Sequence, residues 1–174
     1  MPEDQEFINS QIKRWSDEVE KNPNDFETLS AIGAAYGKLG QHKKSLSFFQ
    51  RAIAANPNYA EAYLGIAATY GFLGKIEDKI TACQKAIKLK PDYPDAFGNL
   101  GSAYGKIGKY QEAVLAFKEA IRLKPSFPDA HFGLGLAYAS LGQMNLASEQ
   151  AEILTKQFPA LGEQLHQMIK NLRK

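Results

Sequence analysis

Apolar residues recur at helical spacing along this chain, and each block of them is followed by a second block. Between residues 94 and 108 the apolar positions fall at i, i+3, i+7 and i+10, and they are Phe97, Leu100, Tyr104 and Ile107. This spacing puts them on one face of an α-helix. Gly108 follows the last of them, and a glycine in the left-handed conformation commonly ends a helix. The pattern predicts a first helix that ends near residue 107.

A second apolar stripe follows this helix and runs up to a proline. Its members are Tyr110, Ala113, Val114, Phe117, Ala120, Ile121 and Leu123. Pro125 then stops the second helix, because proline lacks an amide hydrogen and clashes with the preceding turn. Pro94 and Pro128 stand where a new helix begins, a position at which the missing N–H costs nothing. We therefore expect a pair of helices in this stretch.

The same unit recurs along most of the chain with a period of 34 residues. Prolines keep this period at Pro23, Pro57, Pro91, Pro125 and Pro159, tyrosines at Tyr36, Tyr70, Tyr104 and Tyr138, and glycines at Gly40, Gly74, Gly108 and Gly142. A second small residue recurs at Gly33, Ala67, Gly101 and Gly135. Such a period is typical of stacked helix pairs, in which neighbouring units bury a continuous core.

Six residues of one unit lie at the spacings that define the tetratricopeptide repeat (TPR): Gly101, Tyr104, Ala113, Phe117, Ala120 and Pro125. The chain resembles this family over residues 26–161. The resemblance implies four repeats, at 26–59, 60–93, 94–127 and 128–161, after an N-terminal half repeat in 1–25 and before a C-terminal capping helix in 162–174. It implies an all-α fold, one continuous domain built as a right-handed superhelical α-solenoid of antiparallel helix pairs, with about ten helices.

Both ends of the chain carry apolar stripes that fit such a stack. Ile8, Ile12, Trp15 and Val19 precede Pro23, as in a second helix whose first helix is absent. At the other end, one stripe is formed by Leu161, Leu165, Met168, Ile169 and Leu172. We expect this last helix to turn its apolar face toward the final repeat and its polar face toward water.

The composition is that of an ordinary globular protein and argues against several classes. Apolar residues make up 44% and charged residues 23%, which disfavours a disordered chain. No apolar stretch reaches the roughly 18 residues of a membrane span, and the net charge of +2 gives no reason to expect nucleic-acid binding or membrane insertion. The acidic start carries no apolar core segment of a signal peptide. We expect a cytoplasmic location and leave a mature exported domain open.

Residues suited to catalysis or metal binding are few and isolated. The histidines are His42, His131 and His166, and none has a metal-ligating partner three or four residues away. Cys83 has no histidine at the repeat spacing, so a small buried side chain is its simplest interpretation. The sequence contains no phosphate-loop, zinc-protease or hydrolase nucleophile motif. We expect no enzyme activity, no cofactor and no metal site.

In the TPR family the first helix of each repeat lines a concave groove that binds peptides, and the resemblance implies the same positions here. The expected peptide-binding residues are Glu27, Ser30, Ala34 and Lys38, then Glu61, Leu64, Ala68 and Phe72, then Asp95, Asn99, Ser102 and Lys106, and finally Asp129, Phe132 and Leu136. The adjacent row is Ala31, Gly65, Asn99 and Gly133. Small residues in this row either leave a wide floor for a partner backbone or only relieve crowding between first helices. Phe132 and Leu136 are expected to lie outside the repeat core.

Two binding modes of the family are not expected here. The clamp for acidic C-terminal tails needs lysine, asparagine and arginine at positions that hold Ser30, Ala34, Gly65, Asp95 and Asn99. The asparagine ladder of the O-GlcNAc transferase type has its one counterpart in Asn99. The acidic residue near the start of each first helix either stabilises the helix dipole or forms an acidic rim. We expect a protein partner with apolar anchors and some basic residues.

The sequence thus favours a non-enzymatic protein-interaction scaffold that binds a peptide or helix of a partner in the concave groove. The alternative is a self-assembling module that oligomerises through the groove or through its N-terminal half repeat. In that half repeat Ile8, Ile12 or Trp15 would lack a helix to cover them.

The second repeat departs from the pattern at two positions. Lys79 stands where the other repeats have Ser45, Ala113 and Ala147, and Cys83 replaces the aromatic residue of Phe49 and Phe117. The two helices of a repeat are expected to cross closely at the first of these positions. We expect the stem of Lys79 to bend outward so that its ammonium stays hydrated.

Overall fold

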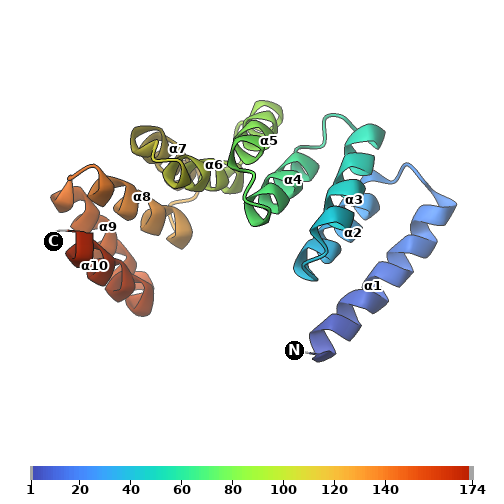
Figure 1. The fold of residues 1–174 in the computed structure, drawn as a ribbon, viewed down its shortest axis with the longest axis horizontal. Helices are drawn as coiled ribbons and strands as arrows, with labels where there is room; N and C mark the ends of the chain where they lie inside the picture. The colour runs from blue at the N-terminus through green and yellow to red at the C-terminus, as the bar shows by residue number, and fades with distance from the viewer. Residues whose placement is uncertain (1, 173–174) are drawn as a thin grey trace. The chain divides into compact units, whose positions relative to one another are not determined.

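The protein is all-α, and its computed structural model describes residues 2–172, with side chains from residue 4 (Figure 1). The ten helices of this range are α1 (Pro2–Lys21), α2 (Phe26–Lys38), α3 (His42–Ala55), α4 (Ala60–Phe72), α5 (Ile76–Leu89), α6 (Pro94–Lys106), α7 (Tyr110–Leu123), α8 (Pro128–Ser140), α9 (Met144–Gln157) and α10 (Pro159–Leu172). They follow one another as sequential antiparallel pairs, which confirms the expected fold class. No helix among the described residues is long and apolar enough to cross a membrane.

The first helix of each pair, α2, α4, α6 or α8, ends just before one of the recurring glycines. Gly40, Gly74, Gly108 and Gly142 have φ between 69° and 74°, and no other described residue has a positive φ. At Gly108 the next amide, that of Lys109, donates to the Tyr104 carbonyl over 3.0 Å, and the amide of Gly108 donates to Gly105 over 3.2 Å. This Schellman pair satisfies the last carbonyls of α6. The expected left-handed helix end is confirmed at all four glycines.

The chain forms two compact units, residues 1–91 and 92–174. In the first unit, α1 packs on α2, α2 on both α3 and α4, and α4 on α5. In the second unit, α6 packs on α7 and α8, and α10 packs on both α8 and α9. The four helix pairs from α2 to α9 lie inside the ranges expected for the repeats, which stay a prediction as domain boundaries.

One aromatic ring in each unit holds two first helices and a second helix together. In unit 1 the ring of Phe49 on α3 lies against Gly33 of α2, 3.1 Å from where a Cβ would stand, and it fills the side-chain position of Gly65 on α4. In unit 2 the ring of Phe117 on α7 lies against Gly101 and fills the side-chain position of Gly133. Both rings are buried. The absent Cβ atoms therefore make the slots in which the rings pack.

Lys79 fills a similar space between α4 and α5. The lysine is only 7% exposed, so the expectation of an outward, hydrated side chain is wrong. Its Nζ lies 3.3 Å from the point at which Gly71 would carry a Cβ. A glycine on the facing helix thus gives the long side chain room inside the crossing, where the other repeats place a small residue.

The apolar stripes at the two ends of the chain are only partly covered. On α1, Ile12 and Val19 are buried against the first unit, whereas Phe7 is 65% exposed. On α10, Leu165 and Ile169 are buried, whereas Met168 and Leu172 are exposed. The expectation that the whole stripe of α10 faces the last repeat is therefore wrong. Two successive turns of α10 each carry an apolar side chain, Met168 and Leu172, that the core does not cover.

Candidate functional site

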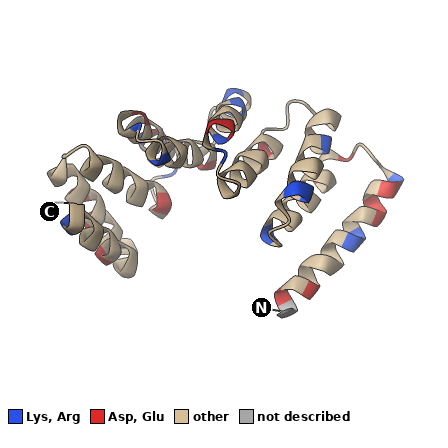
Figure 2. Ribbon diagram, viewed as in Figure 1, with Lys and Arg blue, Asp and Glu red and all other residues tan. Residues whose placement is uncertain are grey.

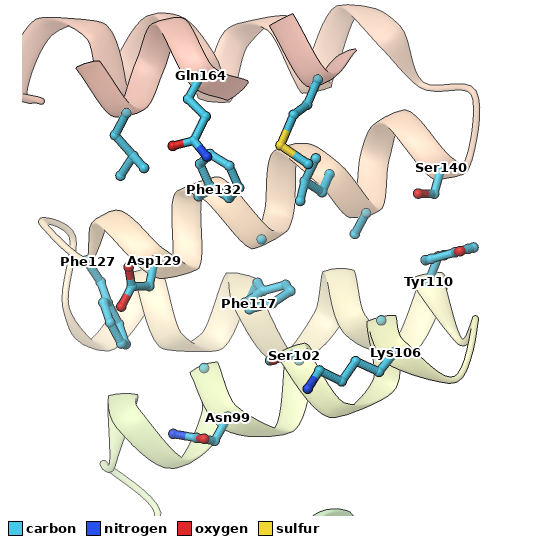
Figure 3. Close-up of a pocket in the computed structure, with 18 of the residues that line it drawn as sticks. Asn99, Ser102, Lys106, Tyr110, Phe117, Phe127, Asp129, Phe132, Ser140 and Gln164 are labelled. Atoms are coloured by element: carbon cyan, nitrogen blue, oxygen red, sulfur yellow. The ribbon is translucent and has the colours of Figure 1, made fainter. Parts of the chain in front are cut away.

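A cleft of about 800 Å³ opens on the face of unit 2 that is formed by its first helices. α6, α8 and α10 supply most of its lining, and Tyr110 and Phe117 of α7 and Phe127, just before α8, complete it (Figure 3). This volume lies within the range of about 300–1,000 Å³ that ligand sites in proteins occupy.

The sequence places α10 beside this cleft through two close contacts. The side chain of Leu165 packs where Gly135 of α8 would carry a Cβ, at 2.7 Å from that point. Gly162, in the first turn of α10, lies so close to Thr155 of α9 that a Cβ would meet the backbone of that helix. Both residues of α10 are buried. These contacts fix α10 and direct its opposite side toward the cleft.

One wall of the cleft is apolar. Phe132 and Leu136, one turn apart on α8, face it together with Leu161, Met168 and Leu172 of α10. Phe132 and Leu136 are half-buried and pack partly against the core of unit 2, so the expectation that they lie wholly outside the core is wrong. Met168 and Leu172 remain exposed. Solvent-exposed apolar side chains that meet in a concave surface commonly mark a contact site.

The opposite wall, from α6, is polar and built from small residues. Asn99, Ser102 and Lys106 line it. The amide nitrogen of Asn99 donates to the Asp95 carbonyl of its own helix over 2.9 Å. A Cβ on Gly105, which also lines this wall, would have no atom within 4 Å. The backbone of α6 is therefore open to the cleft at this residue.

The charges of the lining lie apart. Asp129 is in the first turn of α8 and Lys106 is in the last turn of α6. Figure 3 shows Asp129 beside Phe127 at one end of the cleft and Lys106 farther along it, with its side-chain nitrogen toward Ser102. α8 carries no other Asp or Glu and no Lys or Arg, and it is drawn almost entirely tan in Figure 2. The lining thus carries one anionic and one cationic side chain, separated along the cleft.

The structure places six of the seven site residues predicted in unit 2 around this cleft. They are Asn99, Ser102, Lys106, Asp129, Phe132 and Leu136. The seventh, Asp95, is exposed and does not line the cleft.

The predicted site residues of unit 1 are more dispersed. Glu27, Ala34 and Lys38 are exposed, and Leu64 and Ala68 are half-buried. Ser30 is buried, so this predicted groove residue is not accessible to a partner. A second cavity, of about 370 Å³ between α1, α2 and α3, is lined by none of the predicted residues.

Two further predicted residues of unit 1 are held by neighbouring side chains. Glu61 accepts a hydrogen bond from Lys90 over 2.9 Å. Desolvation acts to raise the pKa of Glu61, but the hydrogen bond and the charge of Lys90 outweigh it, so this pKa is lowered. Phe72 is 74% exposed, and its ring stacks on His42 with centroids 5.2 Å apart. The charge of Glu61 is therefore largely compensated, which weakens an acidic rim in this unit.

The contribution of α10 to the cleft is not predicted from the sequence. Leu161, Gln164, Met168 and Leu172 line it, although the sequence assigns this helix only a capping role. The signal was present in the width of its apolar stripe, since Leu165 and Ile169 alone would cover the last repeat. Gly65 and Gly133 make room for aromatic rings of the second helices, which fill both side-chain positions, as in the second of the two interpretations of this row. Gly133 also lines the cleft.

The side chains of His131 and Cys83 are buried within the fold and do not line the cleft. The Nδ1 of His131 lies 2.8 Å from Oε1 of Gln150, and its Nε2 lies 2.9 Å from the Pro125 carbonyl. His131 thus ties α8 to α9 and to the turn before α8. Cys83 is fully buried, and this burial raises the pKa of its thiol to about 11.

Comparison with models of known protein families assigns the chain to a family. Models described as TPR repeat match residues 72–108 and 106–142, and models described as tetratricopeptide repeat match residues 26–59 and 48–81. These matches extend over residues 26–142, and the chain belongs to the tetratricopeptide repeat family. No curated protein matches the sequence.

Solved structures agree with this assignment at the level of the fold. The crystal structure of MamA is 24% identical, with a TM-score of 0.76 over 94% of this chain and 91% of that chain. YrrB, described as a TPR protein with an unusual peptide-binding site, is 21% identical, with a TM-score of 0.74 over 83% and 75% of the two chains. The first TPR domain of Spaghetti (RPAP3), bound to the HSP90 peptide SRMEEVD, is 22% identical, with a TM-score of 0.66 over 67% and 93%.

Proposed function

We propose that this protein is a non-enzymatic interaction scaffold that binds a segment of a partner protein in the cleft of unit 2. TPR domains typically mediate protein or peptide binding, and YrrB and RPAP3 are described with a peptide-binding site and a bound peptide. The observation that carries the proposal is the exposed apolar wall of the cleft, above all Met168 and Leu172. Apolar anchors in a concave surface commonly supply most of the binding energy.

An acidic tail is not the expected ligand. RPAP3 holds the peptide SRMEEVD, but the positions for a cationic clamp in this chain carry Ser30, Ala34, Gly65, Asp95 and Asn99. Within the cleft, Lys106 is balanced by Asp129. The lining therefore favours a segment recognised chiefly through apolar side chains, with charged residues at its ends.

The test uses two leucines of unit 2 as a matched pair. Leu172 lines the cleft and is 52% exposed, whereas Leu115 on α7 lies outside the cleft and is 67% exposed. Peptides are selected from a random phage-displayed library on the wild-type protein, and their affinities are measured for wild type, Leu172→Asp and Leu115→Asp. We expect a loss of about tenfold or more for Leu172→Asp alone. The proposal is contradicted if the peptides bind Leu172→Asp with the affinity of the wild type, or if Leu115→Asp lowers their affinity instead.

Self-association remains a second candidate, and one observation favours it. Phe7 on α1 is 65% exposed, while Ile12 of the same helix is buried and cannot take part. Light scattering over a concentration series measures it, with Phe7→Ser as the variant. A mass that rises with concentration in the wild type and not in Phe7→Ser supports self-association, and a monomer throughout excludes it.

A further inference from the structure

We infer that the partner segment bound in the cleft of unit 2 is an amphipathic α-helix and not an extended strand of peptide. This inference rests on the proposed function and adds the conformation and charge pattern of the ligand. Three features of the lining support it: the arrangement of apolar side chains, the few polar side chains along the wall of α8 and α10, and the position of the two charges.

The apolar side chains form two short ridges at helical spacing. Phe132 and Leu136 are four residues apart on α8, and Met168 and Leu172 are four residues apart on α10. Between such ridges, a partner helix can place side chains at i, i+3 or i+4 and i+7, which is the pattern of helix-in-groove recognition.

An extended peptide laid against the wall of α8 and α10 would find few partners for its backbone there. Its amide and carbonyl groups alternate along the strand and each needs a hydrogen bond when buried. Asp129, Ser140 and Gln164 are the polar side chains that these two helices contribute to the lining. On the wall of α6, the amide nitrogen of Asn99 is already bonded to the Asp95 carbonyl. The neighbouring position, Gly133, has no side chain and is filled by the ring of Phe117. A helix makes its backbone hydrogen bonds internally, so it needs no ladder of amides.

The wall of α6 allows a helix to approach closely. Ser102 is small, and a side chain on Gly105 would meet no atom within 4 Å, so the backbone is open there. Small residues on one helix allow a second helix to pack against its backbone.

The charges specify where charged residues of the segment lie. Asp129 is at one end of the cleft, and the side-chain nitrogen of Lys106 lies farther along it, toward Ser102 (Figure 3). We expect a basic side chain of the partner near Asp129 and an acidic one near Lys106, with an uncharged apolar stripe between them.

The experiment selects from a phage-displayed library of random peptides of about 16 residues, four to five turns of helix. Binders are kept only when Leu172→Asp weakens them at least about tenfold and Leu115→Asp does not. Their conformation is read from the Cα chemical shifts of the isotope-labelled peptide in the complex. Each peptide is then compared with a version that carries proline at its centre, which breaks a helix and is tolerated by many extended ligands.

Helical chemical shifts, apolar residues at i, i+3 or i+4 and i+7, and a loss of about tenfold or more on insertion of proline support the inference. Strand-like shifts with proline tolerated overturn it and leave the proposed function standing. If no peptide depends on Leu172, both the proposed function and this inference fail. For the charges, Asp129→Asn is expected to weaken peptides with a basic end about threefold or more and to leave peptides without it unchanged; equal effects on both overturn the charge assignment.

Discussion

The ring of Phe117 occupies the place where Gly133 would carry its side chain. The ring comes from α7 and the glycine from α8, so this contact joins the second helix of one pair to the first helix of the next. On its other side the ring lies 2.9 Å from the side-chain position of Gly101 on α6. Phe117 is thus held between two glycines, and it also lines the cleft.

Gly133→Ala is therefore expected to destabilise unit 2, although alanine is the better helix former. The added methyl overlaps a buried ring, and overpacking of this kind costs roughly 1–3 kcal/mol. Thermal and urea unfolding measure the change. Phe117→Leu in the same chain should recover part of the loss, because it frees space beside residue 133, and a double-mutant cycle shows this coupling.

The control for this substitution is Gly105→Ala. Gly105 is helical, and a Cβ there would have no neighbour within 4 Å. The gain in helix propensity should therefore appear undiminished and stabilise the protein by up to about 1 kcal/mol. Two glycines in neighbouring first helices thus predict opposite signs. A common sign for both would contradict the packing around Phe117.

Gly108→Ala should destabilise the protein for a different reason. Gly108 has φ of 74°, and a Cβ there would meet no neighbouring atom. The penalty is one of backbone conformation, roughly 1 kcal/mol. Gly108→Asn is the informative comparison, since asparagine tolerates the left-handed region better than alanine. Unfolding midpoints should rank wild type above Asn above Ala, and an Ala variant as stable as wild type would refute the helix end described here.

Asp25 should make a pH-dependent contribution to stability. Its carboxylate accepts hydrogen bonds from the hydroxyl and the backbone N–H of Thr28, at 2.8 Å and 3.2 Å, and these bonds lower its pKa below the ordinary value of an aspartate. A lowered pKa in the folded state means that the stabilisation is complete above about pH 4 and is lost as the pH falls through the folded value. Asp25→Ala should cost about 1 kcal/mol near neutral pH, as for other helix caps.

The matched variant is Asp25→Asn, which keeps a capping oxygen but has no charge to titrate. Its free energy of unfolding near neutral pH should stay close to that of the wild type. Between pH 5 and 2 this free energy should fall less than in the wild type, by a difference on the order of a few tenths of a kcal/mol. A wild type and an Asn variant with the same acid dependence would show that Asp25 makes no pH-dependent contribution.

Cys83 should be unreactive while the protein is folded. The side chain is fully buried, and desolvation raises the pKa of its thiol to about 11, because it outweighs the opposite effect of the nearby charge of Lys79. A thiol reagent at neutral pH is expected to modify Cys83 only at the rate of unfolding. Because the folded pKa lies above the ordinary value of a cysteine thiol, the stabilisation from the neutral thiol is present below about pH 9 and declines as the pH rises toward 11.

The Cys83→Ala variant separates these effects. Its stability between pH 8 and 11 should fall less steeply than that of the wild type, at a cost of about 1 kcal/mol at neutral pH for the lost packing. Fast labelling of the folded wild type would contradict the burial of this residue.

Much of the candidate site depended on packing that a helical pattern does not reveal. The repeat register indicates a face of α6 and α8 for the site, because positions 34 residues apart occupy equivalent places in successive helix pairs. It does not show that Ser30 is buried, that Glu61 is bonded to Lys90, or that Met168 faces the cleft. Each of these depends on a residue of another helix and on the rotamer that fits there.

The sequence by itself determined the helices, their ends and their pairing. Helical periodicity, the prolines and the left-handed glycines act within a few residues of chain, and the repeat multiplies the same local signal four times. The tertiary structure decided which glycines are filled and which are open, where α10 lies, and how Lys79 fits beside Gly71. The physical reason is that a glycine specifies only an absence of side chain. Whether that space holds the ring of Phe117, as at Gly133, or stays open to a partner, as at Gly105, depends on which helix packs over it.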